Sequence, residues 1–177
     1  AGTVLPEVMV ERTRGALRQF PQKRVIAHFM QPHFPFLGEM GKEFEHGGIS
    51  VGTSLETNAP NPWYGTMFGM LDPEPVLRAY RENHRIAISA VSTLLDDISG
   101  KVVISADHSN LVGQTIRPIP IKAYGHPPSL FHPALTRVPW VTRPPTGQRP
   151  AITSELPQLE RLEDDNIEEK LSALGYK

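Results

Sequence analysis

Cysteine is absent from this chain of 177 residues. Its absence excludes disulfide bonds, thiolate metal ligands and a cysteine nucleophile, and it is typical of a cytoplasmic protein, which is the localisation we predict. No apolar run approaches the about 18 residues that a membrane-spanning helix needs, so we predict no membrane segment. The first residues also lack the pattern of a signal peptide.

An excess of charge of one sign is also missing. The sequence has 18 Lys and Arg residues against 19 Asp and Glu residues, with a net charge of −1. A nucleic-acid-binding surface usually leaves a basic excess, so we predict no nucleic-acid partner. The length suits one domain with its own core, and we predict a single domain over residues 1–177.

Proline, in contrast, is abundant, with 18 residues in the chain. The prolines concentrate in residues 32–75 and 118–150. Proline has no backbone N–H and breaks both helices and sheet ladders. We therefore predict two long ordered loop regions there, and a loop of such length in a compact domain is usually functional or mobile.

The pattern of apolar residues between these regions predicts alternating helices and strands. A helix is expected from Pro6 to about Gln19. The apolar run 24–30 is typical of a buried strand, ended by the proline that follows it. A long helix is expected to begin after Asp72 as N-cap and to end near Gly100.

A second buried strand is predicted at 101–106, directly after the long helix. Strand, helix and strand in this order indicate a parallel sheet with a right-handed crossover, and hence an α/β fold. A last helix is predicted over 156–174. We divide the domain into an N-terminal helix (1–23), a strand–loop–helix–strand unit (24–106), loops that carry the candidate site (107–150) and a C-terminal helix (151–177).

The polar residues of interest follow the two predicted strands. Asp107 and His108 come directly after the second strand, and His33 comes just after the first. His126 lies 19 residues beyond Asp107. Ligands of open α/β sheets bind at the carboxyl ends of the strands, and Asp and His are suitable ligands for zinc or manganese. Each of these residues taken alone is more typical of an ordinary polar loop than of a metal site.

Three segments together resemble the alkaline phosphatase/sulfatase superfamily. The run from Ala106 to Gln114 is similar to that family's Asp-His-Gly-x-x-x-Gly-Glu signature. Residues 32–36 are similar to its Pro-His-x-Pro-Tyr/Phe element, and residues 124–127 to its Tyr-x-His-Gly/Pro element. The helical segment from Tyr80 to Asn83 resembles the family's Tyr-x-x-Asn helix. The resemblance extends from about Arg24 to Trp140.

The resemblance implies a partial three-layer α/β/α sandwich with a mostly parallel sheet, corresponding to the C-terminal portion of the family's catalytic domain. It implies that Asp107, His108 and His126 bind a divalent metal, Zn or Mn first and Ca or Mg as alternatives. His33 and His126 would contact the phosphate or sulfate of the substrate. The activity implied is hydrolysis or transfer of phosphate or sulfate esters, on a phosphorylated or sulfated small molecule or glycan.

The sequence also departs from the family's pattern. No strand followed by a Ser or Thr nucleophile is found, so no catalytic nucleophile is assigned in this chain. Ser109 stands where the family has Gly, and Gln114 stands where Glu is common.

A non-catalytic relative that binds an anion or a partner protein is therefore an alternative, as is an unrelated α/β interaction protein. His132 is a further candidate ligand. Unpaired strand edges in a partial sheet predict self-association.

Overall fold

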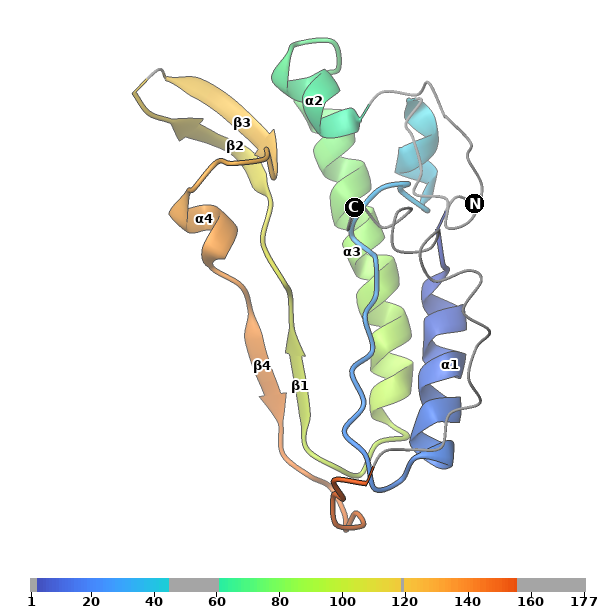
Figure 1. The fold of residues 1–177 in the computed structure, drawn as a ribbon. Helices are drawn as coiled ribbons and strands as arrows, with labels where there is room; N and C mark the ends of the chain where they lie inside the picture. The colour runs from blue at the N-terminus through green and yellow to red at the C-terminus, as the bar shows by residue number, and fades with distance from the viewer. Residues whose placement is uncertain (1–2, 45–60, 119, 156–177) are drawn as a thin grey trace, which may run out of the picture.

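The computed structural model describes residues 3–44, 61–118 and 120–155, and this part has mixed α/β structure. Two long helices, α1 and α3, lie together on one side of the molecule in Figure 1. Two narrow β-ribbons lie on the other side, one above the other. The predicted C-terminal helix over 156–174 lies outside the described residues.

Helix α1 spans Pro6–Gln19, as the sequence predicts. A proline at the first helical position costs nothing there, because that N–H has no partner within a helix. Val10 is only 3% exposed and packs with Ala90 and Leu94 of α3. Burial of these side chains holds the two helices together.

Helix α3 spans Pro73–Leu95, and its N-cap is Asp72, whose carboxylate accepts a hydrogen bond from the backbone N–H of Glu74 at 3.0 Å. This start was predicted, but the helix ends earlier than the expected Gly100. Arg143 donates its guanidinium N–H groups to the backbone carbonyls of Leu95 and Ile98. A side chain from a distant strand thus bonds the carbonyl of the last helical residue, Leu95, and that of Ile98 just beyond the helix.

The prediction of a parallel sheet is wrong for the described residues. Strand β1, Val102–Ser105, pairs antiparallel with β4, Trp140–Arg143. Strand β2, Leu111–Ile116, pairs antiparallel with β3, Ile121–Gly125, across a short turn. These are two separate two-stranded sheets, and the described part contains no three-layer sandwich. Only β1 was predicted as a strand, because the proline content of 107–150 hid the other three.

The apolar run 24–30 is extended but forms no ladder with another described segment. The prediction of a buried strand there is therefore wrong, since hydropathy reports burial but not the presence of a pairing partner. One side of the run is covered, because Phe29 packs against the α1–α3 contact. The other side is open, and Ile26 is 93% exposed.

The two proline-rich regions are more regular than predicted. The first contains the short helices η1, Glu39–Glu43, and α2, Pro62–Met67, and the second contains α4, Pro133–Thr136, in addition to the strands. Trp63 of α2 is 3% exposed and is a central member of a core cluster with Val76 and Ala79 of α3. The upper end of α3 is thus surrounded by loops that its own side chains hold in place.

Candidate functional site

Three of the seven histidines meet at the upper end of α3. The ring centres of His108 and His126 are 4.4 Å apart, and those of His33 and His126 are 6.1 Å apart. They come from three segments: the loop after 24–30, the loop after β1, and the end of β3. Asp107 belongs to the same cluster, with its Oδ2 atom 3.9 Å from Nε2 of His108. The structure therefore brings together all four residues that the sequence singled out, and we call them the histidine cluster.

His33 is held in place by Asn83, which is completely buried in the middle of α3. The side-chain N–H groups of Asn83 donate to the carbonyl oxygens of Pro32 and His33, at 3.2 and 2.9 Å. Its Oδ1 atom accepts from the backbone N–H of Leu37 at 3.1 Å. One side chain thus satisfies three backbone groups of the loop and fixes the backbone that carries the His33 ring.

His126 is positioned by the close approach of β3 to α2. Gly125 has a φ of +70°, and a Cβ atom there would lie 2.6 Å from Cγ of Trp63. Glycine is therefore required at Gly125 both for its backbone conformation and for the contact. Directly after it, Nδ1 of His126 is 2.8 Å from Oδ1 of Asn110, and Nδ2 of Asn110 donates to the Tyr80 hydroxyl at 3.2 Å. The ring is thus connected through Asn110 to α3.

Each of the three imidazoles uses its Nδ1 atom in the same way. Nδ1 of His33 is 2.6 Å from the carbonyl oxygen of Phe34, and Nδ1 of His108 is 3.0 Å from that of Ser109. In His126 the partner is the amide oxygen of Asn110. These oxygens only accept hydrogen bonds, so Nδ1 carries the hydrogen in each ring. In a neutral imidazole this leaves the lone pair on Nε2, which is the arrangement found in most metal-binding histidines.

Loss of solvation favours the neutral form in two of the rings. Burial lowers the pKa of His33, and the nearby His108 lowers it further, against the hydrogen bond to Phe34 and the charge of Asp107, which raise it. Loss of solvation also lowers the pKa of His126, and His108 and His33 add to the effect. Although His126 is exposed as a residue, its ring is crowded by the other two imidazoles. Neutral rings are suitable metal ligands but have no charge with which to attract an anion.

The donor set fits a divalent metal ion in its chemistry. Zinc binds imidazole nitrogen at about 2.0 Å, so two rings on one zinc ion have centres about 5 Å apart, between the two spacings observed here. As the side chains stand in the described residues, no group of three or more His, Cys, Asp or Glu side chains is arranged to hold a metal. Oδ1 of Asp107 accepts from the backbone N–H of His108 at 2.9 Å, so its Oδ2 atom is the one directed toward the rings.

Other candidates lie outside this arrangement. Nδ1 of His132 accepts a hydrogen bond from the backbone N–H of Ala134 at 3.1 Å and so caps α4, which gives it a structural role. Sequence reasoning missed Asn110 as a partner of His126, and it did not foresee that Tyr80 and Asn83 would hold the cluster. The Tyr-x-x-Asn spacing was the available signal, because residues three apart lie on the same face of a helix.

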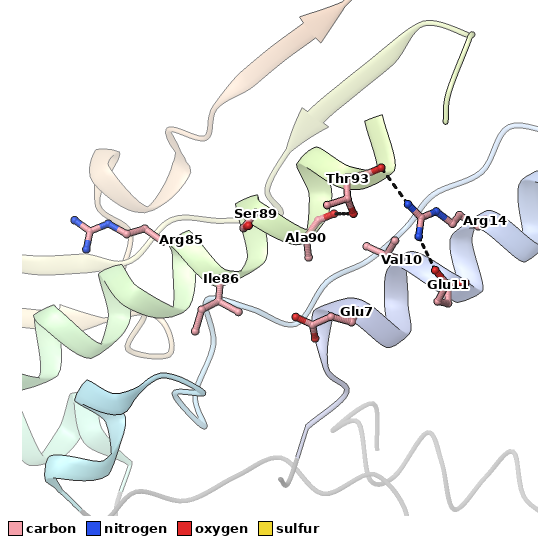
Figure 2. Close-up of a pocket in the computed structure, with 9 residues that line it drawn as sticks. All are labelled: Glu7, Val10, Glu11, Arg14, Arg85, Ile86, Ser89, Ala90 and Thr93. Carbon is pink, nitrogen blue, oxygen red and sulfur yellow. Dashed lines mark hydrogen bonds and ion pairs between the residues drawn. The ribbon is translucent and has the colours of Figure 1, made fainter. Parts of the chain in front are cut away.

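A groove between α1 and α3 lies apart from the histidine cluster (Figure 2). Its wall is formed by Glu7, Val10, Glu11 and Arg14 from α1 and by Arg85, Ile86, Ser89, Ala90 and Thr93 from α3. Arg14 is already bonded to Glu11 and Asp97 and to the Thr93 carbonyl. The groove contains no histidine, whereas three imidazoles meet in the histidine cluster, so we take the cluster as the candidate site.

Comparison with protein-family models, with curated proteins and with solved structures gives no match for this chain. Among the described residues, no helix is long and apolar enough to cross a membrane. Function is therefore inferred from the residues and geometry of the histidine cluster.

Proposed function

We propose that the histidine cluster binds a divalent metal ion and, through that metal, the phosphate or sulfate group of an ester. The observation that supports this most is that His33, His108 and His126 converge while each ring is bonded at Nδ1 to an oxygen that only accepts. Rotation of the side chains from their present positions would be needed to bring the three Nε2 lone pairs and the carboxylate of Asp107 to one ion, because as they stand no three of them are arranged to hold a metal. These groups provide a nitrogen and oxygen ligand set of the kind that zinc and manganese prefer.

The order of binding follows from the charge of the rings. The lowered pKa values of His33 and His126 keep these imidazoles neutral at pH 7, so they do not bind an anion by charge. A bound divalent ion would supply the positive charge that attracts phosphate or sulfate and stabilises charge that develops during transfer. We therefore assign His33 as a metal ligand together with His108 and His126, in place of the direct anion contact that the resemblance implies, because its Nδ1–H is already bonded to the Phe34 carbonyl.

The reaction class that we propose is hydrolysis or transfer of phosphate or sulfate esters, in a relative of the alkaline phosphatase/sulfatase superfamily. The support for this class is the similarity of residues 32–36, 106–114 and 124–127 to that family's elements, together with their convergence in space. The cluster itself contains no hydroxyl nucleophile. Binding of metal and anion is thus the part of the function that we assign to these residues.

Calorimetric titration with zinc and with manganese tests the proposal. The parent chain is expected to bind one ion, and a double variant with Asp107→Ala and His108→Ala is expected to bind none. A variant with His132→Gln is the matched control, because His132 caps a helix outside the cluster. Equal binding by the parent and the double variant would contradict the proposal.

A second titration tests the order of binding. Inorganic phosphate is expected to bind the chain only when manganese is present, because the neutral imidazoles alone do not attract it. Binding of phosphate to the metal-free chain at neutral pH would show instead that the cluster is a direct anion site.

A further inference from the structure

The extended run 24–30 has the exposure pattern of a strand that lacks its neighbour. Exposed and partly covered residues alternate along it: Arg24, Ile26 and His28 are exposed, and Val25, Ala27 and Phe29 are partly covered. This period of two is the signature of a pleated strand with one face on a core. Within the described residues the run forms no ladder, and its side chain at Ile26 is 93% exposed. An apolar strand with free backbone N–H and C=O groups is a template for another strand.

Strand β1 presents a second edge of the same kind. Its ladder runs to β4, and in the described part of the chain no strand pairs with its opposite edge. Its residues also alternate in exposure, and Val103 is 42% exposed. A strand can be hydrogen-bonded along two edges, so half of the pairing capacity of β1 is unused there.

The run 24–30 and β1 have a shared neighbouring residue at each end. At their amino ends, Cδ of Arg149 is 3.1 Å from where a Cβ atom of Gly100 would be, and the same guanidinium donates to the carbonyl oxygens of Pro21 and Lys23. At their carboxyl ends, His33 and His108 both approach His126. Figure 1 shows both segments running in the same direction. They are bridged by one arginine side chain, which is longer than the about 4.8 Å that separates paired strands.

The charges at the amino ends of the two segments have the same sign. Arg24 and Lys101 are both exposed, and both come directly after the points that Arg149 joins. Neither forms an ion pair with a described carboxylate. A strand that enters between them is therefore favoured if it carries an acidic residue near its amino end.

We propose that the run 24–30 and β1 form the two walls of a site for one additional β-strand, and we call it the strand site. The occupant is a segment of a partner polypeptide that runs parallel to both walls, is apolar in alternate positions and begins with Asp or Glu. It would hydrogen-bond to both edges at once, which is the pairing that a parallel sheet provides. A second copy of this chain is a less suitable occupant. Its own run 24–30 is packed on its helices through Phe29, so that run could not enter between the two walls and could pair with one edge only.

Amide hydrogen exchange of the full chain tests the strand site, with a short synthetic strand as the probe. The probe is an acetylated and amidated peptide, Asp-Val-Thr-Val-Thr-Val, and the matched control is the same peptide with Lys in place of Asp. We expect the acidic peptide to slow exchange about tenfold at amides in 25–29 and in 102–105 together, because both edges become hydrogen-bonded. We expect the lysine peptide to need about tenfold higher concentration for the same effect.

Two variants of the chain complete the design. Ile26→Glu is expected to abolish the effect of the acidic peptide, because it places on the edge a charge of the same sign as the peptide's. Phe131→Glu is the control, since Phe131 is equally exposed at 93% but lies outside both edges, and it should behave as the parent. The proposal is overturned if amides in 25–29 are already protected in the dilute chain or become protected only with rising protein concentration. It is also overturned if the peptide slows one edge alone or neither.

Discussion

At the scale of single residues, the proposed metal site depends most on Asn110. Its amide group connects Nδ1 of His126 to the Tyr80 hydroxyl, so it decides which nitrogen of His126 is free. Replacing Asn110 with Ala removes that orientation without removing a ligand. We expect zinc affinity to fall about ten- to a hundredfold, the usual cost of losing a residue that orients a metal ligand.

Calorimetry on Asn110→Ala and on His132→Gln checks this prediction side by side. Both changes remove a side-chain hydrogen-bond partner from the part of the chain that follows β1, but only Asn110 is bonded to the cluster. Equal zinc affinities for the two variants would show that Asn110 has no positioning role.

The titration of the histidines predicts a dependence of stability on pH. Loss of solvation lowers the pKa of His33, His84 and His126 below the ordinary value of 6.5 in the folded chain. Between the folded and unfolded pKa values the unfolded chain binds more protons, so the free energy of unfolding falls as pH falls below about 6.5. Above that pH this contribution is fully present.

Urea unfolding at about pH 7.5 and about pH 5.5 measures the effect, with metal excluded. The parent should be less stable at the lower pH. The change should be smaller in His84→Gln, which removes one of the three groups and leaves the histidine cluster intact. A parent whose stability rises on acidification would contradict the assignment of neutral rings.

At the scale of elements, helix α3 is the part that organises the cluster. Tyr80 and Asn83 are three positions apart on α3, and they hold the His126 and His33 segments respectively. We predict that Asn83→Ala destabilises the chain by about 3 kcal/mol, because buried backbone groups of Pro32, His33 and Leu37 lose their partner. Ser92→Ala, whose exposed hydroxyl bonds only within the same helix, should cost less than about 0.5 kcal/mol.

Denaturant unfolding of these two variants measures the difference. If Asn83→Ala were no more costly than Ser92→Ala, then α3 would not be the support of the His33 loop.

The sequence allowed a better prediction of the helices and of the histidine cluster than of the sheet. Helix α1 and the start of α3 were predicted correctly, because a proline at the first turn, a capping Asp72 and an apolar stripe are local signals. Asp107, His108 and His33 were chosen because they follow predicted strands, and His126 because residues 124–127 resemble a family element. The four residues do lie together. Strand pairing was predicted wrongly, because hydropathy does not reveal that β1 pairs with β4, more than thirty residues away.

At the scale of the whole molecule, the described ribbon β2–β3 is joined to the helices where Tyr124 packs with Trp63 of α2 and Val76 of α3. The three loops of the histidine cluster come from separate parts of the chain, so an ion bound by all of them would tie these parts together. Since such an ion binds the folded chain only, zinc at about a hundred times its Kd should raise the melting temperature by about 5–10 °C.

A thermal scan with and without zinc checks this expectation. The double variant with Asp107→Ala and His108→Ala should show no such shift, whereas His132→Gln should shift as the parent does. An equal rise in all three chains would mean that zinc binds outside the cluster.

The proposed metal site requires that three imidazoles present their Nε2 atoms to one metal ion. The most direct measurement is the ¹⁵N resonance of every imidazole nitrogen during a zinc titration by NMR. We predict that at one equivalent of zinc the Nε2 resonances of His33, His108 and His126 shift together, while those of His28, His84 and His132 do not. Shifts confined to the second group, or no shift in any of the three cluster rings, would contradict the claim.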